Sequence, residues 1–128
     1  EVEAANEIAV KRAWAAIDAG LVINPDGLVN QTEGGIIQTV SWALKEAVQY
    51  DHSRILTGNW SDYPILTFEE SPPVEVTIVN RPGEPPLGAG EGAQGPTVAA
   101  IANAIHNAMG VRLRDMPFTR ERVLAALA

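Results

Sequence analysis

The sequence predicts an α+β fold in which helices lie on one face of a small sheet. Three patterns lead to this expectation. Apolar residues alternate near the N-terminus as in a strand, recur at helical spacing further on, and do so again after a segment rich in glycine and proline. The 128 residues have the length of one domain, and we expect residues 1–128 to form a single one.

The first predicted element is a strand from Ile8 to Ile17. Its apolar side chains occupy both alternating faces, which is typical of a largely buried strand. Trp14 on this strand is therefore expected in the core. The chain then continues to Asn24, which is expected to cap a helix, and Pro25, which suits the first turn of that helix.

The helix that follows has the strongest periodicity in the chain. Apolar residues recur at helical spacing at Ile36, Ile37, Val40, Leu44, Ala47 and Val48. Trp42 within it is assigned to the core. Gly27, Gly34 and Gly35 each lower helix propensity by about 1 kcal/mol relative to alanine. We therefore expect another backbone or a ligand to approach the helix closely at these glycines.

Strands are predicted in the middle of the chain. Two short extended pieces are expected at residues 54–57 and 62–66, with Trp60 between them in the core. From Val74 to Ile78 apolar and polar residues alternate, which indicates a half-buried strand.

A loop and two helices complete the predicted fold. Arg81 to Pro96 contains five glycines and four prolines, which excludes regular structure. A helix is predicted from Pro96 to a stop at Gly110. This helix has no charged residue, so we expect it to be buried on most sides and the loop before it to be packed. Thr119 is expected to cap a final helix over Arg120–Leu127.

Composition excludes several classes of function. A net charge of −7 without a basic stripe is unsuited to phosphate backbones, so no nucleic-acid partner is expected. No run approaches the roughly 20 apolar residues of a membrane-spanning helix. Because the chain has no cysteine, it can bind no iron–sulfur cluster itself. The first residue is Glu1 rather than methionine, which suggests a chain that is processed or cut from a longer one.

Glu91 is the leading candidate for chemistry, in the segment Gly88-Ala-Gly-Glu-Gly92. A carboxylate flanked by residues with little or no side chain can be approached closely by a bulky cofactor or substrate. A carboxylate that such a ligand shields from water is a better general base than a solvated one. Spacing alone leaves two interpretations open, this one and a flexible loop with one solvated glutamate.

Few other side chains are candidates. The amide of Gln31, beside Gly34 and Gly35, could hydrogen-bond a polar ligand, or it could lie exposed on the polar side of the helix. His52 and His106 have no second histidine or carboxylate at ligand spacing, so we expect no metal bound by protein side chains. A phosphate-binding loop and a dinucleotide fingerprint are both absent from the sequence.

The chain also carries a series of spaced motifs. They are Asp18-Ala-Gly-Leu-Val-Ile-Asn-Pro-Asp-Gly27, Gln31-Thr-Glu-Gly-Gly-Ile36, Asp62-Tyr63, Gly88-Ala-Gly-Glu91, Ala99-Ala-Ile-Ala-Asn-Ala-Ile105 and Gly110-Val-Arg-Leu-Arg-Asp-Met-Pro117. In this order they resemble the end of the large subunit of molybdenum hydroxylases, the xanthine dehydrogenase and aldehyde oxidase family. The resemblance extends from about Ile8 onward. The nearest branch resembles the β chains of isoquinoline 1-oxidoreductases.

The resemblance implies part of a molybdopterin-binding domain. The implied cofactor is molybdenum with molybdopterin cytosine dinucleotide, and the implied reaction hydroxylates an aldehyde or N-heterocycle with water as the oxygen source. In that family the glutamate of the Gly-x-Gly-Glu motif removes a proton from a hydroxide ligand of the metal, and Glu91 occupies its position. Gln31 matches a glutamine that in the family lies beside the pterin or the metal ligands. The backbone amides of Gly88, Ala89 and Gly90 would stand close to the cofactor.

Two departures from the family accompany the resemblance. The family often has valine where this chain has Ala89, and proline or serine where it has Gly92. Gly83-Glu84-Pro85-Pro86 offers a second Gly-Glu, so Glu84 competes with Glu91 as the base. Family large subunits are also several times longer. We therefore expect a C-terminal fragment, inactive alone, that needs the remainder of the large subunit and a subunit or domain with iron–sulfur clusters.

Other functions stay open at this point. The chain could instead be a non-catalytic binding or assembly module that retains the family fold. A hydrolase that uses Glu84 and Glu91 would explain neither the helix motif nor the tail. The sequence indicates neither the small-molecule substrate nor a bacterial cytoplasmic or periplasmic location.

Overall fold

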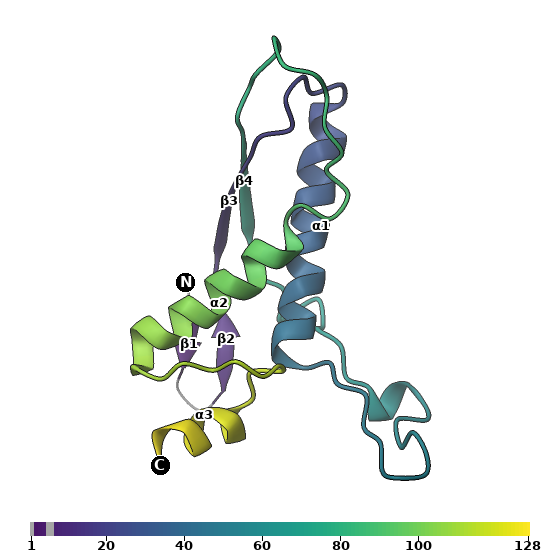
Figure 1. The fold of residues 1–128 in the computed structure, drawn as a ribbon, viewed down its shortest axis with the longest axis vertical. Coiled ribbons are helices and arrows are strands. Elements are labelled where there is room, and N and C mark those ends of the chain that lie inside the picture. Colours follow the sequence, from purple (N-terminus) through teal and green to yellow (C-terminus); the bar gives the residue numbers. More distant parts are fainter. Residues whose placement is uncertain (1, 5–6) are drawn as a thin grey trace.

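A computed structural model describes residues 2–4 and 7–128. The elements are β1 (Val2–Ala4), β2 (Ile8–Val10), β3 (Ala13–Ile17), α1 (Pro25–Leu44), a 3₁₀ turn (Trp60–Asp62), β4 (Val74–Ile78), α2 (Gln94–Met109) and α3 (Arg120–Leu127). Figure 1 shows α1 standing beside β3 and β4, with α2 crossing it and α3 at the end near β1 and β2. The predicted α+β class, with helices packed on a small sheet, is confirmed.

The sheet is divided into two ribbons, which corrects the prediction of one strand from Ile8 to Ile17. β1 and β2 pair antiparallel, while β3 and β4 pair parallel in the register Ala13↔Val74 to Ile17↔Ile78. The break falls at Lys11 and Arg12, two exposed charged residues between the strands. Apolar alternation continues across this break, so it does not reveal that the chain changes partner strand there.

Helix α1 begins as predicted. The side chain of Asn24 accepts a hydrogen bond from the Gly27 N–H at 2.9 Å, and Pro25 is the first helical residue. The helix ends at Leu44, four residues before the predicted Val48. A tertiary contact accounts for the earlier end. The carbonyl of Ala43, in the last turn, accepts a hydrogen bond from the N–H of Phe118 at 2.6 Å instead of from a further turn of the helix.

The core lies where α1, α2 and β2 meet the segment before α3. Its buried members are Val10, Ile36, Val40, Ala43, Ile101, Ile105, Leu113, Phe118 and Val123. The prediction that the tryptophans belong to this core is wrong for two of them: Trp14 is 59% exposed and Trp60 is 81% exposed. Trp42 is half-buried. Trp14 alternates with the half-buried Ala13 and Ala15, so it lies on the exposed face of the β3–β4 ribbon.

Helix α2 starts at Gln94, two residues before the predicted start, and is not buried on most sides. Only Ile101 and Ile105 are fully buried, against α1, and the rest of its surface is half-buried or exposed. Its predicted stop is confirmed, because Gly110 ends it in the left-handed conformation with φ 75°. Thr119 caps α3 as predicted, accepting from the Arg122 N–H at 3.4 Å.

The two extended pieces predicted at residues 54–57 and 62–66 do not form strands. A single bridge joins Tyr50 to Ile55, and the 3₁₀ turn occupies part of the second piece. The segment between α1 and β4, residues 45–73, instead projects in part from the body and is called the arm below (Figure 1). It carries large apolar side chains in solvent, among them Phe68 at 96% exposure. Exposed apolar surface of this kind is typical of a surface that contacts another protein segment.

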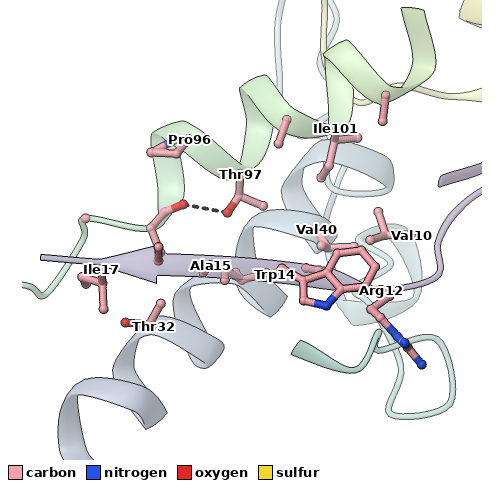
Figure 2. Close-up of a pocket in the computed structure, with 17 residues that line it drawn as sticks. Val10, Arg12, Trp14, Ala15, Ile17, Thr32, Val40, Pro96, Thr97 and Ile101 are labelled. Carbon is pink, nitrogen blue, oxygen red and sulfur yellow. Dashed lines mark hydrogen bonds between the residues drawn. The ribbon is translucent and has the colours of Figure 1, made fainter. Parts of the chain in front are cut away.

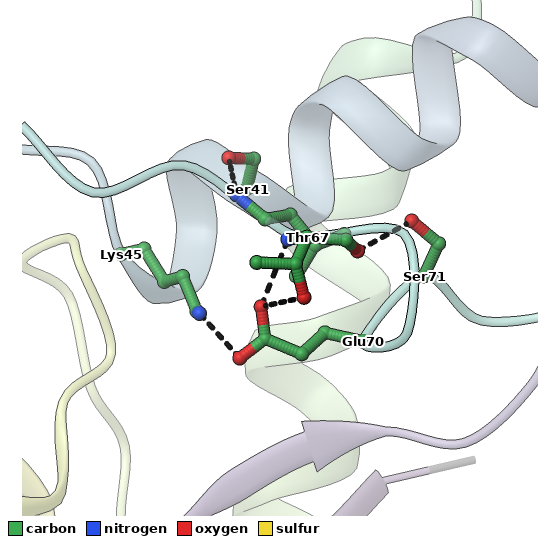
Figure 3. A network of polar contacts seen from close by, with 6 residues as sticks. Ser41, Lys45, Thr67, Glu70 and Ser71 are labelled. Carbon is green, nitrogen blue, oxygen red and sulfur yellow. Dashed lines mark hydrogen bonds and ion pairs between the residues drawn. The ribbon is translucent and has the colours of Figure 1, made fainter. Parts of the chain in front are cut away.

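A polar network fastens the base of this arm to α1 (Figure 3). Lys45 forms an ion pair with Glu70, whose other carboxylate oxygen accepts hydrogen bonds from the N–H and the hydroxyl of Thr67, both at 2.8 Å. Ser41 accepts from the Leu66 N–H at 2.9 Å. The hydrogen bond from Lys45, and then those from Thr67, lower the pKa of Glu70 to about 2.

Acid should weaken this network, and Glu70→Gln should remove the effect. The folded-state pKa of about 2 lies below the ordinary 4.5, so the carboxylate stabilises the fold above pH 4.5 and loses this contribution as the pH falls toward 2. Its side chain is 42% exposed, so solvent screening keeps the contribution small. Denaturant unfolding should show the variant less stable than the parent above about pH 5, with the difference shrinking below pH 4.5 and closing as the pH approaches 2.

The matched control is Glu69→Gln. The exposed Glu69 side chain makes no hydrogen bond or ion pair with any described residue, so this variant should follow the parent at every pH. A difference between Glu70→Gln and the parent that does not change with pH would contradict the assignment.

None of the helices in the described part of the chain is both long enough and apolar enough to cross a membrane.

Candidate functional site

The glycine- and proline-rich segment lies where the loops after β3 and β4 meet, beside the N-terminal end of α1 (Figure 1). Its first half pairs with the loop after β3. The N–H of Leu21 donates to the carbonyl of Glu84 at 3.1 Å, and the N–H of Leu87 donates to the carbonyl of Ala19 at 3.0 Å. The two segments therefore run against each other through backbone hydrogen bonds.

Gly20 makes this close approach possible. Its φ is +65°, a conformation that L side chains rarely adopt. A Cβ atom at Gly20 would stand 2.2 Å from the carbonyl oxygen of Pro85, so no larger residue fits there without movement of the backbone. The glycine requirement is thus both conformational and steric.

Charged side chains reinforce the same junction. The Arg81 guanidinium contacts Asp18 at 2.9 Å and Glu84 at 3.0 Å. Asp18 also accepts from the Gly20 N–H at 3.0 Å. The hydrogen bond from Arg81, and then that from Gly20, lower the pKa of Asp18, and the same contact raises the pKa of Arg81. Arg81 and Asp18 are therefore both charged at neutral pH, and their ion pair joins the two loops.

A second anchor joins the other half of the segment to α1. The side-chain N–H of Gln31 donates to the carbonyl of Gly90 at 2.7 Å, across 59 positions of sequence. Gln38, two turns further along the same face, accepts from the side chain of Gln94 at 3.4 Å. The contact between Gln38 and Gln94 was not predicted from the sequence. The one sequence feature that could have indicated it is the seven-residue spacing of Gln38 from Gln31, which places these two glutamines on one face of α1.

The three glycines of α1 differ in their surroundings. A Cβ at Gly35 would lie 3.5 Å from the Cβ of Ala93, an ordinary van der Waals contact with a side chain, so the expected close approach of another backbone is not found there. Gly34 has no atom within 4 Å of that position, and Gly27 meets only its own cap residue Asn24. A methyl group at Gly34 or Gly35 would therefore make no contact closer than an ordinary van der Waals contact.

Glu91 lies just after the second anchor. It is exposed, and its side chain has no hydrogen-bonding or ion-pair partner among the described residues. Its carbonyl accepts from the Gln94 N–H at 3.2 Å, in the turn that starts α2. Gly88, Gly90 and Gly92 have no atom within 4 Å of a Cβ position, so open space lies beside the backbone. Glu84, the competitor, is engaged by Arg81.

The loop is thus exposed rather than packed, which corrects the expectation, yet it is anchored at both ends. The pairing with the loop after β3 holds Glu84 to Leu87, and Gln31 holds Gly90. Gly88 and Ala89 lie between these anchors. Of the predicted site residues, the structure therefore brings Gln31 against the Gly88–Glu91 segment. No group of three or more His, Cys, Asp or Glu side chains within residues 2–4 and 7–128 is arranged to hold a metal ion.

Known proteins resemble this chain in sequence over nearly its whole length. The family model described as molybdopterin cofactor-binding domain matches residues 2–72. A nicotinate dehydrogenase chain of Pseudomonas putida is 48% identical over 121 residues, covering 94% of this chain and 10% of that protein. The beta chain of isoquinoline 1-oxidoreductase of Brevundimonas diminuta is 37% identical over 112 residues, covering 88% of this chain and 14% of that protein.

A solved structure agrees with these relatives. Quinoline 2-oxidoreductase from Pseudomonas putida 86 superposes with a TM-score of 0.76 at 29% identity, covering 89% of this chain and 16% of that one. This chain therefore spans well under a fifth of the length of each of these three proteins. The fold and the sequence point to the same group of proteins.

Proposed function

The chain belongs to the molybdopterin cofactor-binding domain family of molybdenum hydroxylases, and from this premise we propose that it is the C-terminal segment of an oxidoreductase large subunit. The proposed reaction hydroxylates an aldehyde or N-heterocycle with water as the oxygen source. The relatives named after nicotinate, isoquinoline and quinoline support the N-heterocycle in particular. The observation that carries the proposal is the hydrogen bond from Gln31 to Gly90, because it joins the two motifs of the resemblance in space.

The residues present fit such a cofactor. The glycines of the anchored loop leave their backbone uncovered, so a bulky planar group can lie against it. The amide oxygen and the second N–H of Gln31 remain for a ligand after its bond to Gly90. The described residues offer no cluster of metal-ligating side chains, which suits a metal that is carried by the cofactor's own ligands.

We assign each residue of the site a part in the reaction. Backbone N–H groups of Gly88, Ala89 and Gly90 would bind the cofactor, and the side chain of Gln31 would orient it. The cofactor, when bound, supplies the two-electron redox chemistry. The carboxylate of Glu91 would accept the proton released when water provides the oxygen atom, since it has no competing partner among the described residues.

The proposed assembly is larger than this chain. The uncovered outer face of β3–β4 and the apolar arm suit burial against the remainder of the large subunit. The cofactor is proposed to be the cytosine dinucleotide form. Because this chain has no cysteine, electrons would leave through iron–sulfur clusters on a partner subunit or domain. The fragment alone would then neither hold the cofactor tightly nor turn over.

Metal and pterin analysis of the polypeptide encoded by the complete gene tests this function. We expect about one molybdenum and one pterin per large subunit after expression under cofactor-sufficient conditions. A complete protein that folds under those conditions without molybdenum would contradict the oxidoreductase and would support the non-catalytic assembly module.

A further inference from the structure

A groove of about 420 Å³ lies between β3, α1 and α2 (Figure 2). Its floor is formed by the apolar side of α1, with Ile36 and Val40. Strand β3 forms one wall and the first turns of α2 form the other. The groove is separate from the anchored loop, except that Gly92 lies at its rim.

The groove runs along the unpaired edge of β3. All five residues from Ala13 to Ile17 line it, whereas a groove over one face of a strand would contact every second residue. The N–H of Ala13 and the carbonyl of Ile17 bond to the segment of β4, so the groups of Trp14 and Ala16 point the other way, into the groove. Neither of these two residues has a backbone partner there among the described residues.

Small residues predominate on the wall opposite this edge, which also includes Pro96 and Ile101. Ala93, Thr97, Ala100 and Ala104 follow one another at helical spacing on the side of α2 that lines the groove. A five-residue strand is about 16 Å long, so the volume corresponds to a cross-section on the order of 25 Å². Such a cross-section is about 5 Å on a side, close to the spacing of roughly 4.8 Å between paired strands.

We propose that an extended strand occupies this groove and pairs with the free edge of β3. Parallel strands normally belong to larger sheets that are covered on both faces. An uncovered apolar strand edge can also pair with strands of other molecules, which leads to aggregation. The groove walls are apolar and narrow, so the strand would present small apolar side chains to α1.

The occupant we commit to is a segment of the same polypeptide outside these 128 residues. The chain covers only 10% to 18% of its curated relatives, so a protein of their length has ample further chain to supply a strand. Strand addition needs the backbone groups of Trp14 and Ala16 rather than any catalytic group. The inference rests on the proposed function in one respect, that this chain is a segment of a longer large subunit, but its test does not depend on catalytic activity.

Hydrogen exchange of the complete polypeptide tests the pairing. The amides of Trp14 and Ala16 should exchange at least about 100-fold more slowly than unstructured amides, as slowly as the amide of Ala13 that bonds to Pro73. Free exchange at Trp14 and Ala16 beside a protected Ala13 would overturn the proposal, whether or not the protein contains molybdenum.

Photo-crosslinking identifies the occupant. p-Benzoylphenylalanine in place of Ala100, on the groove wall, should crosslink to residues of the same molecule outside the 128-residue segment. The same group in place of Ala108, which is exposed on α2 but does not line the groove, should not reach that segment. Crosslinks from Ala100 to a second copy, or only to residues 1–128, would overturn the assignment, as would a gene that encodes nothing beyond these residues.

Discussion

Replacing Glu91 with glutamine in the complete enzyme is expected to lower turnover by about 10²- to 10⁴-fold. Glutamine keeps the size and polarity of the side chain but cannot accept a proton. Folding and molybdenum content should be unchanged, because the Glu91 side chain is exposed and contacts no polar partner in the described part of the chain. The measurement is kcat at saturating substrate, alongside molybdenum content and the thermal midpoint.

Glu84→Gln is the matched control for this variant. It removes a carboxylate seven positions away that is bound to Arg81 at 3.0 Å, so it should weaken the loop junction slightly and change kcat only a few-fold. If Glu91→Gln instead turned over almost normally while Glu84→Gln lost activity by orders of magnitude, the role of base would pass to Glu84. Equal loss in both variants would indicate that neither acts alone.

Gly20→Ala is expected to lower the stability more than alanine at any other glycine of this chain. The left-handed backbone costs alanine about 1–2 kcal/mol, and the new Cβ would lie 2.2 Å from the carbonyl oxygen of Pro85. The backbone must therefore move and give up hydrogen bonds between the two loops. We expect at least ~2 kcal/mol lower free energy of unfolding in the complete protein, measured by denaturant titration.

Substitutions at two other glycines separate the cost of the left-handed backbone from the cost of the clash with Pro85. Gly110 has φ 75° but no atom within 4 Å of a Cβ position, so Gly110→Ala should show only the conformational cost. Gly34 is helical and equally open, so Gly34→Ala should stabilise the fold by about 0.5–1 kcal/mol. If Gly20→Ala were no more destabilising than Gly110→Ala, the contact with Pro85 would not limit the loop junction.

Local signals predicted several elements well. Asn24 and Pro25 define the start of α1, Gly110 ends α2 and Thr119 caps α3, because each acts through hydrogen bonds or dihedral angles within a few residues of itself. Alternation over Val74–Ile78 likewise predicted β4. These features depend on neighbours in sequence, so no knowledge of the fold is needed to recognise them.

Predictions about burial and strand partners were less successful for a common reason. Apolar character placed Trp14 and Trp60 in the core, although no described element of this chain covers them. The uncharged α2 was expected to be enclosed, yet its small residues line an open groove. Composition reports what a residue prefers to contact, and it does not report whether the contact lies within the same 128 residues.

The site combines both kinds of information. The motifs around Gln31 and Glu91 identified the family from the sequence alone, and the match over residues 2–72 agrees with it. Only the tertiary structure decided that Gln31 holds Gly90, that Gln38 meets Gln94, and that Gly20 lets the two loops cross. Those contacts join residues about 60 positions apart, and their geometry follows from the packing of α1 against α2 and β4 rather than from any local preference of the chain.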